Sequence, residues 1–504
     1  MELPNWRLPV LCLFICSCEP ATPPETQISA LPNIILLMGD DHSWEETGYN
    51  GHPYLLTPVL DEMAASGLVL NQFHAATPFC SPTRGSIITG RHPNRYGTFT
   101  PGWSIRPEEI SIAQLLVQAG YTTAHFGKWH LGPVKSNSPT NPGAMGFQRW
   151  VSHDNFFEMD PVLSKNGAHP IKMPGEGSEV IVDETIRFVE QATSENQPFF
   201  AVVWFGSPHE PYSGLDQDLA LYHNLPDSIN EVTVRLTSME TGKQVERPLG
   251  EVLQERFAEI TAMDRAIGKL RDSLTSYGIR ENTIFWYCGD NGIPPSGVFN
   301  NPFRGRKGMV YQGGLRVPSI IEWPQGLPKA RVTDVNTVTS DIFNTLCEVT
   351  GQTPPKRPLD GISLLPLIQG KMVSRPDPIF FWNYEIQHEL EYNREPYIET
   401  PLQEGTTPLV KIMGGLYTRN FRNFHHPDIQ DSDFDGPRAI LDNQYKLVIN
   451  GDAQAPGIEL FDVSKDPQEQ NNLAEIYPEV VEKMEAQLIQ WQQSVLHSLT
   501  GADY

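Results

Sequence analysis

One stretch, residues 80–91, combines a nucleophile with groups that bind an anion. It reads Cys-Ser-Pro-Thr-Arg-Gly-Ser-Ile-Ile-Thr-Gly-Arg. Ser81 is suited to cap a helix and Pro82 to its first position, so the pattern predicts a helix that begins directly after Cys80. An anion is favoured at that helix end, and Arg84 lies on the same face. The pattern therefore predicts an anion site at Cys80, although a buried structural cysteine at a helix cap would also fit these residues.

Two pairs of polar residues come directly after apolar runs. Asp40 and Asp41 follow the run 33–38, and Asp290 and Asn291 follow the run 283–288. Adjacent carboxylates at a strand end repel one another unless a cation holds them. Four oxygen donors suit Ca²⁺ better than zinc or copper. A solvated turn is the alternative for either pair taken alone.

Basic residues and histidines lie in three further segments. Lys128 and His130 alternate onto one side of an extended chain in Gly-Lys-Trp-His-Leu-Gly, 127–132. His209 follows the apolar run 198–205, where it could donate to an anion or protonate a leaving alcohol. Lys307 lies in the basic, glycine-rich segment 304–308, which could also be a solvated turn.

Alternating strands and helices must position these groups. Short apolar runs predict strands buried on both faces, and amphipathic segments predict helices at 57–67, 111–120, 255–277 and 341–351. This order predicts an α/β fold with a large, mostly parallel sheet between helices, and ligands bind beyond the carboxyl ends of such strands. Asp264 and Arg265 are expected at a solvated helix edge. Residues 213–250 have no clear period and are expected to form an insertion beside the site.

The two ends of the chain differ from this middle part. Residues 1–18 have the charge and apolar pattern of a secretory leader, and the proline-containing segment 19–31 predicts a tether. Ile15-Cys16-Ser17-Cys18 resembles a bacterial lipobox, which would put a lipid anchor on Cys18; an ordinary cleaved signal peptide is the alternative. Either leader predicts export to the periplasm or the cell surface. Residues 32–375 are predicted to form the catalytic domain and 376–504 a smaller α+β subdomain with an antiparallel sheet.

Composition narrows the classes of partner. The 504-residue chain carries a formal charge of −24, which argues against nucleic acid or an anionic membrane as its main partner. Of six cysteines, three lie in the leader, so Cys80, Cys288 and Cys347 offer no disulfide framework.

The motifs together resemble type I sulfatases of the alkaline phosphatase-like superfamily. The segment 80–91 is similar to their activation motif, Cys-x-Pro-x-Arg followed by Thr-Gly-Arg, and 127–132 is similar to their second signature. The segment 304–318, ending in Gly-Gly-Leu-Arg-Val-Pro, follows in the family's order. The resemblance extends over roughly residues 32–370, and it implies the same sheet and a small antiparallel C-terminal subdomain.

The resemblance also implies a mechanism. A formylglycine-generating enzyme would oxidise Cys80 to formylglycine (3-oxoalanine), whose hydrated aldehyde attacks sulfur. One Ca²⁺ would be held by Asp40, Asp41, the Cys80-derived group, Asp290 and Asn291. Arg84, Lys128 and Lys307 would bind the sulfate, His209 would protonate the leaving sugar oxygen, and His130 would help to expel sulfate.

The motifs leave the substrate open. An exported sulfatase fits the digestion of algal polysaccharides such as ulvan or galactans, and a glycosaminoglycan is the alternative. A phosphodiesterase or phosphonate hydrolase of the same superfamily and an inactive glycan-binding relative are the rival functions. A thiol phosphatase would need an arginine at position 86, which is serine. Residues that could face a sugar are His42, Trp44, Trp103, Arg106, His153 and those of 385–437.

Overall fold

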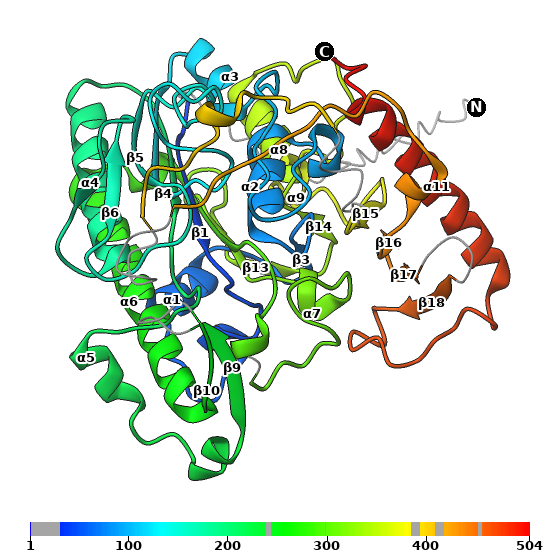
Figure 1. The fold of residues 1–504 in the computed structure, drawn as a ribbon, viewed down its shortest axis with the longest axis horizontal. Helices are drawn as coiled ribbons and strands as arrows, with labels where there is room; N and C mark the ends of the chain where they lie inside the picture. The colour runs from blue at the N-terminus through cyan, green and yellow to red at the C-terminus, as the bar shows by residue number, and fades with distance from the viewer. Residues whose placement is uncertain (2–30, 238–242, 298, 385–393, 409–417, 452–455) are drawn as a thin grey trace.

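The apolar runs predicted as buried strands form the centre of the main sheet in a computed structural model of the chain (Figure 1). The structure describes residues 1, 31–237, 243–297, 299–384, 394–408, 418–451 and 456–504. The predicted leader, tether and lipid anchor at Cys18 fall on residues 2–30, outside the described residues. No helix in the described ranges combines the length and the apolar character that a membrane span requires.

Ten strands of the described residues make up this sheet. Its order is β13 (Arg331–Thr333), β2 (Leu68–Leu70), β12 (Ser319–Glu322), β11 (Thr283–Gly289), β1 (Asn33–Gly39), β8 (Phe199–Trp204), β4 (Thr122–Lys128), β5 (Arg149–His153), β6 (Val162–Lys165) and β7 (Ile171–Lys172). The five strands from β11 to β5 are parallel, whereas β12 and β6 run antiparallel to their neighbours. The prediction of a mostly parallel sheet is therefore confirmed.

Helices cover both faces of the sheet, on opposite sides in Figure 1. Alternate residues of β1 point to opposite faces. Leu36 packs with α2 (Cys80–Thr89), α3 (Ile112–Gln118) and α8 (Asp341–Thr350), and Leu37 packs with α1 (Pro58–Ser66), α4 (Gly177–Ser194) and α6 (Leu249–Ser276). Shorter helices are α5 (Asp216–Leu219), α7 (Gln312–Leu315) and α9 (Leu365–Ile368). Covering on both faces explains why the central strands are apolar throughout.

A second, antiparallel sheet lies near the C-terminus, as expected. It consists of β15 (Ile379–Trp382), β16 (Arg438–Asp442), β17 (Tyr445–Asn450) and β18 (Gly457–Asp462). The long helix α11 (Pro478–Leu499) packs its Met484, Leu488 and Val495 on this sheet. The boundary at 375/376 remains a prediction.

Three local expectations were wrong. Helix α2 begins at Cys80 with Phe79 as its cap, two residues earlier than predicted, because the carbonyl oxygen of Phe79 accepts the Thr83 N–H at 3.1 Å. The buried Ser81 hydroxyl has no hydrogen-bond partner among the described residues and caps nothing. Pro82 is consequently the third helical residue, where a missing N–H is still tolerated.

The region 213–250 is more ordered than expected, and α6 begins at Leu249 rather than at residue 255. The region 213–250 contains α5 and an antiparallel pair of strands, β9 (Thr233–Thr237) and β10 (Gln244–Pro248). A further small sheet pairs β3 (Phe73–His74) with β14 (Thr337–Val338).

Candidate active site

The carboxyl ends of β11, β1, β8 and β4 bring the polar residues to one edge of the sheet. The loops after these strands are joined by backbone hydrogen bonds, from the Asp40 N–H to the Ser207 oxygen at 3.0 Å and from the Asp290 N–H to the Gly39 oxygen at 3.2 Å. Asp41 then turns into the site with a φ of 62°. This shared edge is the one that parallel-sheet geometry predicts for a ligand site.

Three carboxylates and three cations meet at this edge, all of them buried or nearly so. Lys128 Nζ donates to Asp40 at 2.5 Å, Arg84 to Asp290 at 2.7 Å, and Lys307 Nζ to Asp41 at 2.5 Å. These pairs satisfy charges that would otherwise be costly to bury.

The pKa values of Asp41 and Asp290 are shifted in opposite directions. Burial alone would raise the pKa of Asp41, but the charge and the hydrogen bond of Lys307 hold it below its usual value. Burial and the nearby Asp40 charge raise the pKa of Asp290 to about 6, although Arg84 opposes this. Such competition between like charges favours a bound cation.

The residues present fit a hard divalent metal ion. Ligand atoms of Asp40, Cys80 and Asp290 lie within 4.8 Å of one another, and so do those of Asp40, Asp41 and His209. Asp40 Oδ1 and Asn291 Oδ1 are buried and have no hydrogen-bond partner among the described residues. Since buried oxygens are normally paired, these two are suited to coordinate an ion, and the oxygen-rich set suits Ca²⁺ or Mg²⁺.

Cys80 lies at the first position of α2, beside His130. Its Sγ is 3.4 Å from His130 Nδ1. Burial raises the pKa of the Cys80 thiol even though Lys128 and Lys307 lower it, so the thiol is protonated at neutral pH. A protonated, buried thiol is a poor nucleophile, which argues against the thiol-phosphatase alternative.

Both site histidines are held in the neutral form. Burial, followed by Lys128 and Arg419, lowers the pKa of His130 well below its usual value, and its Nε2 has no partner in the described part of the chain. His209 Nδ1 contacts the Glu210 carbonyl oxygen at 2.5 Å and so carries the proton, which leaves Nε2 free. Burial also lowers the pKa of His209, so its 3.8 Å contact with Asp41 is not an ion pair at neutral pH.

Comparison with known proteins identifies the family. A family model described as Sulfatase matches residues 32–352. The chain belongs to the sulfatase family. It is a sulfuric ester hydrolase, as the resemblance predicted.

Named relatives of this sulfatase act on different saccharides. It is 29% identical over 394 residues to N-acetylgalactosamine-6-sulfatase of Mus musculus, covering 70% of this chain and 68% of the relative. It is 28% identical over 371 residues to an ulvan-active sulfatase of Formosa agariphila, covering 73% and 70%.

Solved structures share its fold. Ps i-CgsB in complex with k-i-k-neocarrahexaose has a TM-score of 0.72 at 21% identity, covering 92% of this chain and 93% of that one. A phosphonate monoester hydrolase of Agrobacterium radiobacter has a TM-score of 0.65 at 19% identity, covering 93% and 97%.

The structure brings together every residue predicted for the site of this sulfatase, and the roles of these residues remain predictions. Four of the residues that could face a sugar have little exposed surface. His42, Trp103, Arg106 and His153 are buried, and His42 bonds the Tyr287 hydroxyl at 2.5 Å.

Trp44 is the partly exposed exception among these residues. It packs edge-on against Phe303 and under Arg316. Of the segment 385–437, residues 385–393 and 409–417 lie outside the described residues.

Sequence reasoning missed two arginines. Arg256 of α6 is fully buried and pairs with Glu46 while also bonding the carbonyl oxygens of Asp41 and Pro208. Its spacing with Val252 and Ile260 places a charge on the apolar face of the helix, which is the signal that could have revealed it. The second, Arg419, lies in the segment 385–437, which was expected to face a sugar without any single residue being named.

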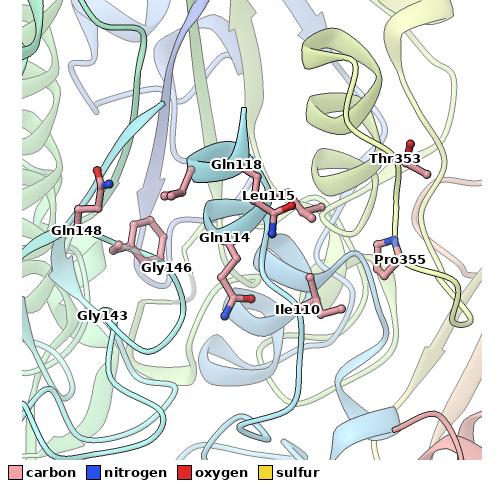
Figure 2. Close-up of a pocket in the computed structure, with 11 residues that line it drawn as sticks. Ile110, Gln114, Leu115, Gln118, Gly143, Gly146, Gln148, Thr353 and Pro355 are labelled. Carbon is pink, nitrogen blue, oxygen red and sulfur yellow. The ribbon is translucent and has the colours of Figure 1, made fainter. Parts of the chain in front are cut away.

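A surface groove of about 660 Å³ lies against α3, away from this site (Figure 2). Gln114, Gln118 and Gln148 are among the residues that line it. Gln148 contacts the N–H of Thr123 at the beginning of β4, whereas Lys128 ends that strand, so the groove is at the opposite edge of the sheet.

Proposed function

We propose that this sulfatase removes a sulfate ester from a sulfated saccharide, with formylglycine made from Cys80 and one bound Ca²⁺. The observation that carries the proposal is the cluster of buried ion pairs around Cys80, in which Asp40 Oδ1 and Asn291 Oδ1 accept no hydrogen bond from any described residue. Such a centre would supply an oxygen nucleophile for sulfur beside a divalent cation that offsets the charge of the sulfate oxygens. Asp40, Asp41, Asp290, Asn291 and the modified residue 80 would hold the ion.

The cationic side chains bind and orient the sulfate group. Arg84 is fixed by Asp290 and by the Lys128 carbonyl oxygen at 3.1 Å, so it needs little rearrangement when an anion enters. Lys307 keeps its protons, because the Asp41 charge holds its pKa above the usual value in spite of burial. Preorganised charges of this kind supply several kcal/mol of transition-state stabilisation.

The two histidines hold or move protons at Nε2. The Glu210 carbonyl oxygen fixes the Nδ1 proton of His209, so Nε2 is the atom that exchanges a proton with the substrate. A bound anion favours the imidazolium, which then has a proton to give to the leaving alcohol. His130 Nε2, buried and without a partner in the described chain, is suited to accept a proton beside residue 80.

An algal polysaccharide fragment is the substrate class we favour, and support comes from the ulvan-active relative and the carrageenan-complex neighbour. A glycosaminoglycan is the second candidate, which the N-acetylgalactosamine-6-sulfatase relatives favour. The fold shared with a phosphonate monoester hydrolase keeps a phosphoester substrate as the rival. Export through the leader, with or without a lipid on Cys18, is part of the same proposal.

The test is sulfate release from a panel of oligosaccharides derived from ulvan, carrageenan and glycosaminoglycans. The enzyme is produced together with a formylglycine-generating enzyme, and the peptide containing residue 80 is weighed to detect the aldehyde. Release from one glycan class supports the proposal and identifies the substrate. A confirmed aldehyde with phosphonate or phosphodiester turnover and no sulfate release would overturn it.

A further inference from the structure

Arg419 is held beside the active site by a folded segment of the C-terminal half. The Arg422 N–H donates to the Gly102 oxygen at 3.0 Å, and the Phe421 N–H donates to the Gln403 oxygen at 2.9 Å. A bridge between Trp103 and Arg422 fixes the same segment to the residues that follow α2. These contacts anchor the backbone at residues 421 and 422, directly after Arg419 and Asn420.

The side chain of Arg419 acts on the site. Its neighbour Phe421 places a ring edge-on to His130, with 6.2 Å between centroids. The positive charge of Arg419 is among those that lower the pKa of His130, and a negative charge at Cys80 would raise the pKa of Arg419. The guanidinium therefore lies within electrostatic range of both.

Arg419 differs from the other basic residues of the site in having no hydrogen-bond or ion-pair partner among the described residues. Arg84, Lys128, Lys307 and Arg256 each bond a carboxylate. No ion pair or hydrogen bond of the Arg419 guanidinium with any described residue is present, and the residue is partly buried. A half-buried, unpaired guanidinium beside an anion-binding site is available for an anionic ligand.

The reacting sulfate does not need this charge, because three cations already surround its place. Arg419 also lies outside the region matched by the family model, residues 32–352. A residue outside the shared region is better suited to recognise the particular substrate of this chain than to serve the shared reaction.

We infer that Arg419 binds a second negatively charged group of the substrate, a sulfate or a carboxylate on the sulfated sugar or on its neighbour. The inference rests on the proposed function, and it makes the enzyme selective for saccharides that carry two anionic groups close together. A guanidinium can bind either group through two parallel hydrogen bonds.

The test compares three oligosaccharides that share one scissile sulfate: one with no other charge, one with a second sulfate, and one with a uronate. We expect the wild type to favour one or both doubly charged substrates, and which one identifies the second group. Arg419→Ala should lower kcat/KM for the favoured substrate about 10- to 100-fold more than for the singly charged one, mainly through KM. Arg419→Lys keeps the positive charge but not the two parallel N–H donors, so kcat/KM for the favoured substrate should fall less than in Arg419→Ala.

The control is Arg149→Ala. This exposed arginine begins β5, at the sheet edge opposite the site, and the same loss of charge there should not change the preference. If Arg419→Ala lowered kcat/KM equally for all three substrates, Arg419 would bind the reacting sulfate, and the inference would be overturned. No preference in the wild type would do the same.

Binding separates this inference from the proposed function. On a Cys80→Ala background, calorimetry should show that Arg419→Ala weakens binding of the favoured saccharide about tenfold or more, and the singly charged one less. Selective weakening without sulfate release by the wild type would leave the inference standing and defeat the proposed function. Sulfate release without selective weakening, or no measurable binding, would defeat the inference.

Discussion

Arg256 ties the metal-ligand loop to the histidine loop, and its replacement tests how the site is positioned. Its guanidinium donates to both carboxylate oxygens of Glu46 at 2.6 Å, to the Asp41 carbonyl oxygen at 2.6 Å and to the Pro208 carbonyl oxygen at 2.7 Å. Tyr212 covers the guanidinium, with its ring centroid 5.4 Å away. One side chain on α6 thus fixes the loops that follow β1 and β8.

Arg256→Met removes the charge and keeps most of the side-chain volume. It leaves the Glu46 carboxylate buried without its partner, together with two unsatisfied carbonyl groups. Losing one partner of a buried pair costs about 3–5 kcal/mol of the free energy of unfolding. Because Asp41 and His209 lose their support, kcat/KM should also fall about 10- to 100-fold, as it does when outer partners of metal ligands are removed.

The assay is urea unfolding followed by tryptophan fluorescence, with sulfate release measured on the same samples. Arg265→Met, nine residues further along the helix, is the control, since this partly exposed arginine pairs with Asp218 and Glu179 and should cost about 1 kcal/mol or less. Adding Glu46→Gln to Arg256→Met should recover part of the lost stability. An Arg256→Met cost no larger than that of Arg265→Met would refute the reasoning.

Four further outcomes are expected. Cys80→Ala should abolish sulfate release and keep the unfolding midpoint of the wild type; substantial residual turnover would contradict the nucleophile. Chelation with EGTA should lower both the melting temperature and sulfate release, and Ca²⁺ should restore both; an unchanged melting temperature would argue against the ion. Burial and the neighbouring glutamate raise the pKa of Glu45 from 4.5 to about 7. Ionised Glu45 therefore lowers the free energy of unfolding, by an amount that is zero below pH 4.5 and largest above pH 7. Glu45→Gln should therefore stabilise increasingly from pH 5 to pH 8, by up to about 3 kcal/mol, and an equal gain at both pH values in calorimetry would contradict this. Gly127→Ala should cost about 2–4 kcal/mol, since a Cβ at its φ of 92° would lie 2.0 Å from a carbonyl oxygen of β8. Gly120→Ala, with a φ of 87° and open space, should cost only about 1 kcal/mol, and equal melting temperatures for the two variants would show that the contact does not matter.

The site edge could be predicted because it follows from a simple geometric rule. Apolar runs long enough for one strand identified β1 and β11, and the residues directly after them had to lie at the carboxyl edge. Asp40 and Asp290 therefore come together although 250 positions separate them. The resemblance then assigned roles that spacing alone left open.

The remaining features depend on packing that no local pattern specifies. Asp264 was expected on a solvated edge, yet it is buried and accepts the Val59 and Leu60 N–H groups at 3.0 and 2.8 Å. It satisfies the free amides at the N-terminus of α1, which was not predicted to pack there. The helical period shows which residues share a face, but not which element covers that face. Arg419 was not identified within the segment 385–437 for the same reason, because that segment has no helical or strand period.

Charge balance within the site explains how an acidic protein can bind an anionic substrate. The formal charge of −24 is a total over the whole chain, and salt screens charges that lie more than about 10 Å away. In the buried site, three carboxylates and three cations cancel: Asp40, Asp41 and Asp290 against Arg84, Lys128 and Lys307. The neutral histidines contribute no charge, so the divalent ion that we propose would give this site a net positive charge. A sulfate monoester carries one negative charge and would be attracted to it. Arg419, which pairs with no carboxylate among the described residues, adds one further positive charge nearby. The charge close to Cys80, rather than the total, therefore determines which saccharides can bind.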